Sequence, residues 1–508
     1  MKTSKASNRN LVAGSMVHPA SSSSPAVNQP VSESFSLSPR WEVWGVIATL
    51  ALGTLIQLNA VFHHGIMGQD FLYNLGFVLR CAKDLSAPFT FEGTNPPFSI
   101  MAYAFIIRWT QGIHFVECIG LLNIVVNLLG MGLVYAIVRR LVRRPLLRLS
   151  TMVLVTFLPV RLIHSVVLSA DAWTVLPFFA ILWLIDQLSR TTEFRAQLRW
   201  ALALCGLLFI SVFIKYTYFS TIAACAGLLI QMGRRNQWAW HKGAMLVVLV
   251  TAIPALTGYM EVKLNGKFSG QWGIQSQMLN VMSPRTVLFF RPADAHILDA
   301  PPYNEPLYDR TALHSTQIFK GFPIEISDYE LLYPNRYSYP ALLHLGIFTD
   351  VLNVFQYDPT DSYIGTRSAI NQSRMALAVK LAVPWSVVCF FAVLFSAILY
   401  LLKGLVKPQA YSARLEALLA LSLAWLLNII VFLPFIMIAY SAGAWLPRLI
   451  VPVVLGFIII LFHVLDQVLD RWKLPGVPSL VLTYALIQSA LHISFLWPWG
   501  NYLPLALN

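Results

Sequence analysis

Residues 120–144 read GLLNIVVNLLGMGLVYAIVRRLVRR, an apolar run that ends in four arginines. A helix of about 20 apolar residues spans the hydrocarbon core of a bilayer. Lysine and arginine collect in loops on the cytoplasmic side of a membrane. The stretch therefore predicts a membrane span that leads into a cytoplasmic loop, and it sets the direction of the spans on either side.

The composition of the whole chain indicates that this span is one of many. Of the 508 residues, 57% are hydrophobic and only 12% are charged, and the mean hydropathy is +0.64. Soluble domains carry about 25% charged residues. We therefore expect a polytopic membrane protein.

The net charge of +13 does not indicate nucleic-acid binding, and we expect no nucleic-acid partner. The basic residues fall in short loops between apolar runs, which is the pattern of cytoplasmic loops. After the loop at 139–148, these loops contain Arg190, Arg195, Arg199, Arg234, Arg235, Lys242, Lys403, Lys407 and Arg414.

The apolar runs predict an all-α bundle of about eleven transmembrane helices with the N-terminus in the cytoplasm. They cover residues 43–62, 120–138, 147–167, 173–188, 200–214, 218–232, 244–260, 376–402, 417–440, 449–466 and 479–497. With this assignment every basic loop falls on the cytoplasmic side. The positive-inside rule and the span count therefore agree.

The remaining segments divide the chain into four parts. Residues 1–40 are rich in serine and proline and read as a disordered cytoplasmic tail. Residues 41–262 form an N-terminal transmembrane module, and residues 374–508 form the C-terminal transmembrane helices. Between them, residues 263–373 are hydrophilic and rich in turns, and we expect a folded external loop domain, since so long a loop is normally functional.

One apolar segment does not fit the alternation. Residues 96–113, PPFSIMAYAFIIRWTQGI, are helical in pattern, but counting them as a span would move the loop at 139–148 outside. We predict a helix that lies along the outer membrane surface, with Pro97 in its first turn. Cys81 and Cys118 both fall on the outer side, and their spacing leaves a disulfide between them open.

Four charged residues occur where an apolar environment should exclude them, and all four map to the outer face: Asp70, Asp171, Lys215 and Arg448. Taken singly, such an aspartate often caps a helix, and such a cation often reaches to the lipid headgroups. Together, two anions and two cations on one face predict a site for an anionic, membrane-embedded substrate.

The order of these features resembles the GT-C membrane glycosyltransferases, in particular the branch of protein O-mannosyltransferases and the lipid A aminoarabinose transferase. The resemblance is carried by Asp70, Asn95-Pro96-Pro97, Asp171, Lys215-Tyr216 and the PRLIVP run at 447–452. It covers residues 43–235 well. The C-terminal part matches only through its spans and Arg448.

The sequence also departs from that branch in two places. Phe71 follows Asp70, where the family often has a second acid. Thr94-Asn95 stands where the aminoarabinose enzyme has Glu-Lys. Arg80 or Lys83 would then take the place of the missing lysine.

The resemblance implies a sugar donor on a polyprenyl phosphate and a lipid, glycan or protein acceptor. Asp70 would be the general base, which takes the proton of the attacking hydroxyl. Lys215 and Arg448 would bind the leaving phosphate. Asp171 would orient the acceptor or Lys215. The remaining substrate-binding candidates are Tyr73, Arg80, Asn95 and Tyr216.

A single displacement would invert the anomeric centre. The reaction would take place on the extracytoplasmic face of a bacterial-type inner membrane. Oligosaccharyltransferases of the wider fold use an external-loop acid with a divalent metal, and the acidic cluster Glu325, Asp328 and Glu330 leaves that requirement open. We predict no metal ligand, because such a cluster is more simply a solvated loop face.

Two other functions fit part of the pattern. A transporter or flippase for a lipid-linked or anionic substrate would also place ionisable residues within its spans. It would be expected to show related halves and broken helices near the middle of the membrane. A non-catalytic membrane scaffold could keep the same fold without activity.

Overall fold

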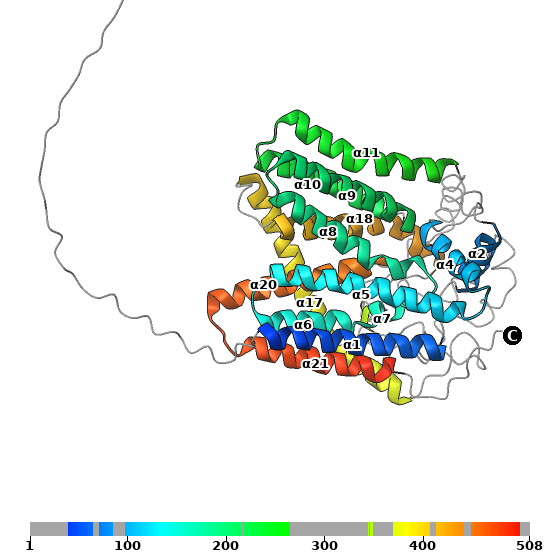
Figure 1. Ribbon diagram of the computed structural model, residues 1–508. Coiled ribbons are helices and arrows are strands. Elements are labelled where there is room, and N and C mark those ends of the chain that lie inside the picture. The colour runs from blue at the N-terminus through cyan, green and yellow to red at the C-terminus, as the bar shows by residue number, and fades with distance from the viewer. Residues whose placement is uncertain are drawn as a thin grey trace, which may run out of the picture. The chain divides into compact units, whose positions relative to one another are not determined.

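The computed structural model describes residues 39–64, 71–84, 97–215, 217–264, 344, 346–348, 369–406, 413–440 and 449–497. Within these ranges the chain forms α-helices and one 3₁₀ helix, and no strand occurs there (Figure 1). Eight helices in these ranges are long and apolar enough to cross a membrane. The prediction of an all-α, polytopic integral membrane protein is therefore confirmed.

The helices form two groups along the chain. The N-terminal group contains α1 (Pro39–His64), α2 (Phe71–Lys83), α4 (Pro97–Trp109), α5 (Phe115–Leu141), α6 (Pro145–Thr156), α7 (Pro159–His164), η1 (Ala170–Trp173), α8 (Val175–Arg190), α9 (Phe194–Ile214), α10 (Tyr218–Arg235) and α11 (Trp240–Leu264). The C-terminal group contains α17 (Ala369–Val406), α18 (Ala413–Tyr440), α20 (Val451–Trp472) and α21 (Val477–Leu496).

The long helices pack side by side, and segments far apart in sequence are neighbours (Figure 1). Helix α6 contacts α1 and α21, α5 contacts α8, and α18 contacts α8, α10 and α20. A large apolar core runs through these helices. A second, smaller core joins α2, α4 and the start of α5 around Val78, Tyr103 and Ile119.

The third predicted span is not one helix. Helix α6 ends at Thr156 and α7 begins at Pro159, so the helix is interrupted at Phe157 and Leu158. A break inside a bilayer exposes carbonyl groups that must find partners within the protein. The buried Arg161 guanidinium donates from Nε to the Thr156 oxygen at 3.0 Å. His492 Nδ1 donates to the Phe157 oxygen, also at 3.0 Å.

Two further predicted spans are the helices α10 and α18, which are not among the eight found in the described residues; the side chains of α18 are described only up to Asn428. Helix α10 has 18 residues and ends in Arg234 and Arg235, and α18 has 28 residues. Both pack against other long helices of the bundle, so the predicted order of elements is kept.

The basic loops meet at one end of the bundle, which we call the arginine end. Arg148 Nη2 lies 2.5 Å from a Glu42 carboxylate oxygen, Arg144 Nη1 lies 2.9 Å from Asp466, and Arg235 Nη2 lies 2.5 Å from Glu416. Asp186 pairs with Arg140, Arg190 and Arg414. These pairs join both ends of the sequence, as the predicted alternation of spans requires.

The opposite end, which we call the Asp171 end, is where α2 and α4 lie (Figure 1). Helix α4 has only 13 residues and packs against α2, α5, α9 and η1. Phe105 and Trp109 remain exposed on it. This short helix agrees with the predicted surface helix, although its position relative to a bilayer stays a prediction. Cys81 and Cys118 are both thiols, so the disulfide that their spacing left open is not formed.

The other predicted segments fall outside the described residues almost completely. Helix α1 begins at Pro39, within the predicted tail, and the rest of that tail is not described. Of the predicted external domain, only residues 263–264, 344, 346–348 and 369–373 are described. Its fold stays a prediction.

The close approach of α5 to α8 depends on Gly130. A Cβ atom there would lie 3.1 Å from the backbone nitrogen of Leu176, whereas one at Gly132 would meet nothing within 4 Å. We expect Gly130→Val to lower the free energy of unfolding by about 1–3 kcal/mol, because the clash is with backbone that cannot rotate away. Gly132→Val on the same helix should change it by less than ~1 kcal/mol. Thermal unfolding in detergent measures both, and equal effects would contradict the close packing.

The second prediction concerns the helix break. Arg161→Met removes the donors to the Thr156 carbonyl and to Asn127 Oδ1 while keeping most of the side-chain length. We expect a loss of about 2–4 kcal/mol, because both acceptors lose a partner away from water. Arg195→Met, at an exposed position of α9, should stay within about 0.5 kcal/mol of the parent. A similarly small effect for Arg161→Met would show that the guanidinium does not hold the break.

Candidate functional site

An ion pair between Asp171 and Lys215 is the centre of the candidate site. Asp171 lies in η1, and Lys215 is the residue that follows α9. Lys215 Nζ donates to Asp171 Oδ1. The side chains are only 5% and 14% exposed, so both charges are largely removed from solvent.

Ser169 binds the second carboxylate oxygen of Asp171. Its hydroxyl donates to Asp171 Oδ2 at 2.9 Å and accepts from the Asp171 backbone N–H at 3.1 Å. Ser169 is thus the N-cap of η1, a position that favours serine. The Asp171 carboxylate therefore has a partner on each oxygen, which fixes its orientation.

A polar cluster on α4 and α5 anchors the segment that leads into η1. Tyr103 donates to Asn123 Oδ1 at 2.8 Å and approaches the Ser169 carbonyl oxygen at 3.1 Å. Asn123 Nδ2 donates to the Val167 carbonyl at 3.0 Å, and Trp173 Nε1 donates to the Tyr103 hydroxyl at 2.9 Å. Burial raises the pKa of the Tyr103 phenol, so its hydroxyl keeps its proton. The segment is held from two helices.

Helix α2 is tied to the same segment. Asn74 Nδ2, on the first turn of α2, donates to the Leu168 carbonyl at 2.8 Å. A small cavity between α2, α4 and the Ser169 backbone is lined by Asn74, Val78, Ser99, Ile100, Tyr103, Leu168, Ser169 and Ala170. The Ser99 hydroxyl in it is buried and has no hydrogen-bond partner among the described residues.

An aromatic cluster joins the site to the C-terminal helices. The Tyr218 hydroxyl on α10 donates to the Thr174 carbonyl at 2.7 Å. The Trp425 ring on α18 packs edge-on against Tyr218, with the ring centroids 4.8 Å apart. Trp425 Nε1 in turn donates to the Leu449 carbonyl at 2.9 Å. These contacts therefore link Leu449, the residue after Arg448, to Thr174, which lies three positions after Asp171.

The predicted site residues divide into two groups. Asp171 and Lys215 lie together, and Arg80 is exposed near the end of α2. Tyr73 lies in α2, but its side chain is not described. The remaining predicted residues lie outside the described ranges: Asp70, Asn95, Tyr216 and Arg448. Their roles stay predictions.

The residues that support η1 were missed by sequence reasoning. Tyr103 and Trp173 have the appearance of ordinary apolar-run aromatics, and Asn74 lies in a mixed segment. Asn123 gave a signal that could have been used, since an amide inside a 27-residue apolar helix needs a partner. Among the described residues, no group of three or more His, Cys, Asp or Glu side chains is placed to hold a metal ion. The cluster Glu325, Asp328 and Glu330 lies outside them.

Comparison with known proteins gives matches among solved structures alone, since neither a protein-family model nor a curated protein matches the sequence. The archaeal oligosaccharyltransferase AglB from Archaeoglobus fulgidus, solved with an inhibitory peptide and a dolichol-phosphate, is 12% identical, with a TM-score of 0.44. The match covers 91% of this chain but only 56% of that one. ArnT from Cupriavidus metallidurans, solved with undecaprenyl phosphate, is 12% identical, with a TM-score of 0.34, and the match covers 90% and 88% of the two chains.

At these TM-scores, neither similarity establishes a fold family or an activity for this chain. A function must therefore be inferred from the side chains that meet at the Asp171 end.

The ion pair can be tested with a double-mutant cycle. Asp171→Asn and Lys215→Met should each cost about 3–5 kcal/mol, because each leaves the opposite charge buried without its partner. The double variant should cost less than the sum by about 1–3 kcal/mol. Thermal unfolding in detergent supplies the four values.

The matched control is a second cycle at the arginine end. Arg143 Nη1 lies 3.1 Å from Asp470 Oδ2, and these side chains are 83% and 41% exposed. Arg143→Met and Asp470→Asn should couple by less than about 1 kcal/mol, because water screens exposed charges. Coupling at Asp171 and Lys215 no larger than this would contradict a buried pair.

Proposed function

We propose that the protein is an integral membrane glycosyltransferase of the GT-C type. It would transfer a sugar from a polyprenyl-phosphate donor to a lipid, glycan or protein acceptor. The observation that carries this proposal is the buried Asp171–Lys215 pair at one end of a membrane bundle, with α2 and α4 packed beside it. A largely buried cation at the end of a membrane bundle suits the phosphate of a membrane-anchored donor.

Lys215 is the proposed phosphate ligand. When the bond between the anomeric carbon and the phosphate oxygen breaks, charge accumulates on that oxygen, and a fixed cation in a dry site stabilises it. Asp171 is a positioning residue in this scheme, because it binds the ammonium group rather than the substrate. Of the two roles predicted for Asp171, the contact supports the orientation of Lys215.

Arg448 is the proposed second phosphate ligand. The support is the position of its neighbour Leu449, whose carbonyl is bound by Trp425 in the aromatic cluster next to η1. An arginine offers a planar pair of donors to a phosphate, whereas Lys215 offers a point charge. The two cations would therefore fulfil different roles on one leaving group.

Asp70 is the proposed general base. It precedes α2, whose first turn is bound to Leu168 through Asn74. The acceptor oxygen would bond to the anomeric carbon as the carbon–phosphate oxygen bond breaks. The hydroxyl proton would pass to Asp70, and the polyprenyl phosphate would leave with the bonding electron pair. A single displacement of this kind inverts the anomeric centre.

The remaining assignments complete the proposal. Tyr73, Arg80, Asn95 and Tyr216 are proposed to contact donor or acceptor. The Asp171 end would face the extracytoplasmic side of a bacterial-type inner membrane, because the arginine end carries the basic loops that favour the cytoplasm.

The proposal predicts a specific loss of turnover. Asp70→Asn should lower the rate of sugar transfer about 10²–10⁴-fold, because the attacking hydroxyl loses its base. Its thermal unfolding midpoint should stay close to the parent. The assay uses the purified full chain in vesicles with radiolabelled polyprenyl-phosphate sugars and envelope lipids or glycans as acceptors. Glu117→Gln, on a half-buried acid at the start of α5, is the control.

Two outcomes would overturn the proposal. One is transfer that Asp70→Asn and Glu117→Gln leave equally unchanged. The other is a chain that moves a labelled polyprenyl-phosphate sugar across the bilayer without transferring the sugar to any acceptor, which would identify a flippase.

A further inference from the structure

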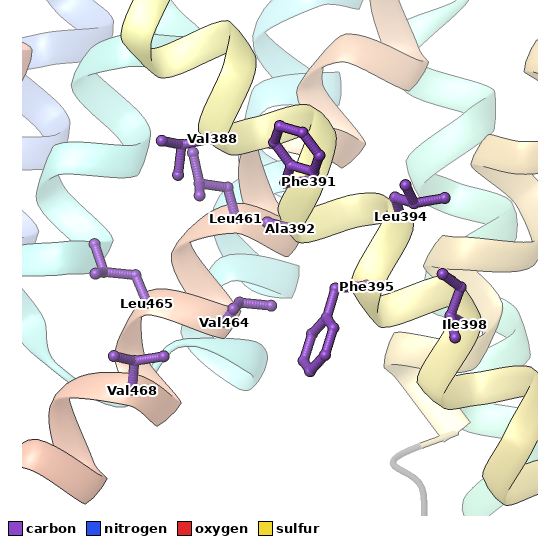
Figure 2. Close-up of a pocket in the computed structure, with 10 residues that line it drawn as sticks. All are labelled: Val388, Phe391, Ala392, Leu394, Phe395, Ile398, Leu461, Val464, Leu465 and Val468. Atoms are coloured by element: carbon purple, nitrogen blue, oxygen red, sulfur yellow. The ribbon is translucent and has the colours of Figure 1, made fainter.

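A groove opens between α17 and α20 on the surface of the bundle, and Figure 2 shows side chains of both helices around it. Its volume is about 550 Å³, which is within the usual range of ligand sites of roughly 300–1,000 Å³. Its lining is apolar throughout: Val388, Phe391, Ala392, Leu394, Phe395 and Ile398 of α17, and Leu461, Val464, Leu465 and Val468 of α20.

The shape of the groove favours a flexible hydrocarbon chain over another helix. Ala392 and Leu461 are buried and form the floor, whereas Phe391 and Phe395 are 60% and 56% exposed and form one wall. Surfaces where membrane helices meet are enriched in small residues that allow close approach. Here the walls are large side chains that line an open apolar groove.

The groove ends toward the arginine end. Val468 lies three and four residues before Arg471 and Trp472, so both continue the apolar stripe of α20 at helical spacing. Both are exposed. Tryptophan prefers the level of the lipid headgroups, and arginine binds phosphate. One helical turn beyond the hydrocarbon groove, the protein therefore presents an aromatic ring and a cation.

The nearby acids do not cancel this charge. Asp470 is paired with Arg143 and Arg144, and Asp466 is paired with Arg144. At 100° per residue, Asp466 and Asp470 lie on the opposite face of α20 from Val468. Counted together with Arg471, this end of α20 has three arginines and two aspartates. The net charge of this group is positive and suits an anionic headgroup.

We propose that the groove between α17 and α20 binds one anionic phospholipid, with an acyl chain against Ala392 and Leu461 and the phosphate at Arg471. Trp472 would lie at the level of the glycerol backbone. This site is at the arginine end, whereas the proposed catalytic residues are at the Asp171 end. The inference therefore does not depend on the glycosyltransferase proposal.

The experiment uses the purified, delipidated full chain in detergent. Native mass spectrometry counts bound phosphatidylglycerol and phosphatidylcholine over a titration of each. The parent should prefer phosphatidylglycerol. Arg471→Gln should reduce that preference about fivefold, which is the effect of one cation near an anionic headgroup. Arg199→Gln, at an exposed position of α9, removes the same charge elsewhere and should leave the preference unchanged.

A second pair of variants tests the groove itself. Ala392→Phe fills the floor, so it should weaken binding of both lipids and leave the ratio between them unchanged. If this variant does not fold, Phe395→Ala replaces it. That change shortens an exposed wall, and it should weaken both lipids in the same way.

Four results would overturn the proposal. Equal effects of Arg471→Gln and Arg199→Gln would indicate general surface charge. Unchanged lipid binding in both groove variants would place the lipid elsewhere. Inorganic phosphate that raises the unfolding midpoint as much as phosphatidylglycerol would identify a free anion as the ligand. A change in oligomeric mass caused by Ala392→Phe would identify the groove as a contact between protein chains.

Discussion

The buried pair of Asp171 and Lys215 is the interaction on which the rest of the site depends. Neither charge is stable alone at 5% and 14% side-chain exposure, so the end of α9 and η1 must meet for either helix to be placed. The capping by Ser169 and the anchors from Tyr103 and Asn123 then serve one purpose, because they hold the short 3₁₀ turn where the lysine can reach it. The polar groups at this end of the bundle form a frame rather than a set of separate contacts.

The same constraint explains the interior of the membrane domain. A broken helix is costly in hydrocarbon unless its carbonyls are bound, and the break after Thr156 is accompanied by Arg161 and His492, which come from α7 and α21. Gly130 meets a related need, since it lets α5 approach the backbone at the start of α8, directly after η1. The proposed catalytic site therefore depends on residues such as Arg161, His492 and Gly130, which hold the helices in place and take no part in the proposed reaction.

The sequence predicts the class and order of helices well, because apolar length and the position of arginines are strong signals that each segment carries by itself. It also indicates Asp171 and Lys215, because a charge in an apolar setting is conspicuous. It could not indicate the break at Leu158, since Pro159 is also compatible with a kinked span, nor the roles of Tyr103 and Trp173, which depend on partners far along the chain. Asp70 and Arg448 show a second limit of sequence reasoning. A motif can predict the chemical role of a residue, but it does not predict where the residue lies in space.

The pairs at the arginine end imply an order of events during biosynthesis. Arg144 is synthesised 322 residues before its partner Asp466, and Arg235 is synthesised 181 residues before its partner Glu416. The early arginines are therefore made before these carboxylates, at the stage of synthesis when positive charge generally directs the orientation of membrane spans. The last helices later bring the carboxylates that neutralise it. In the finished bundle the same arginines form ion pairs that join the N-terminal helices to the C-terminal helices.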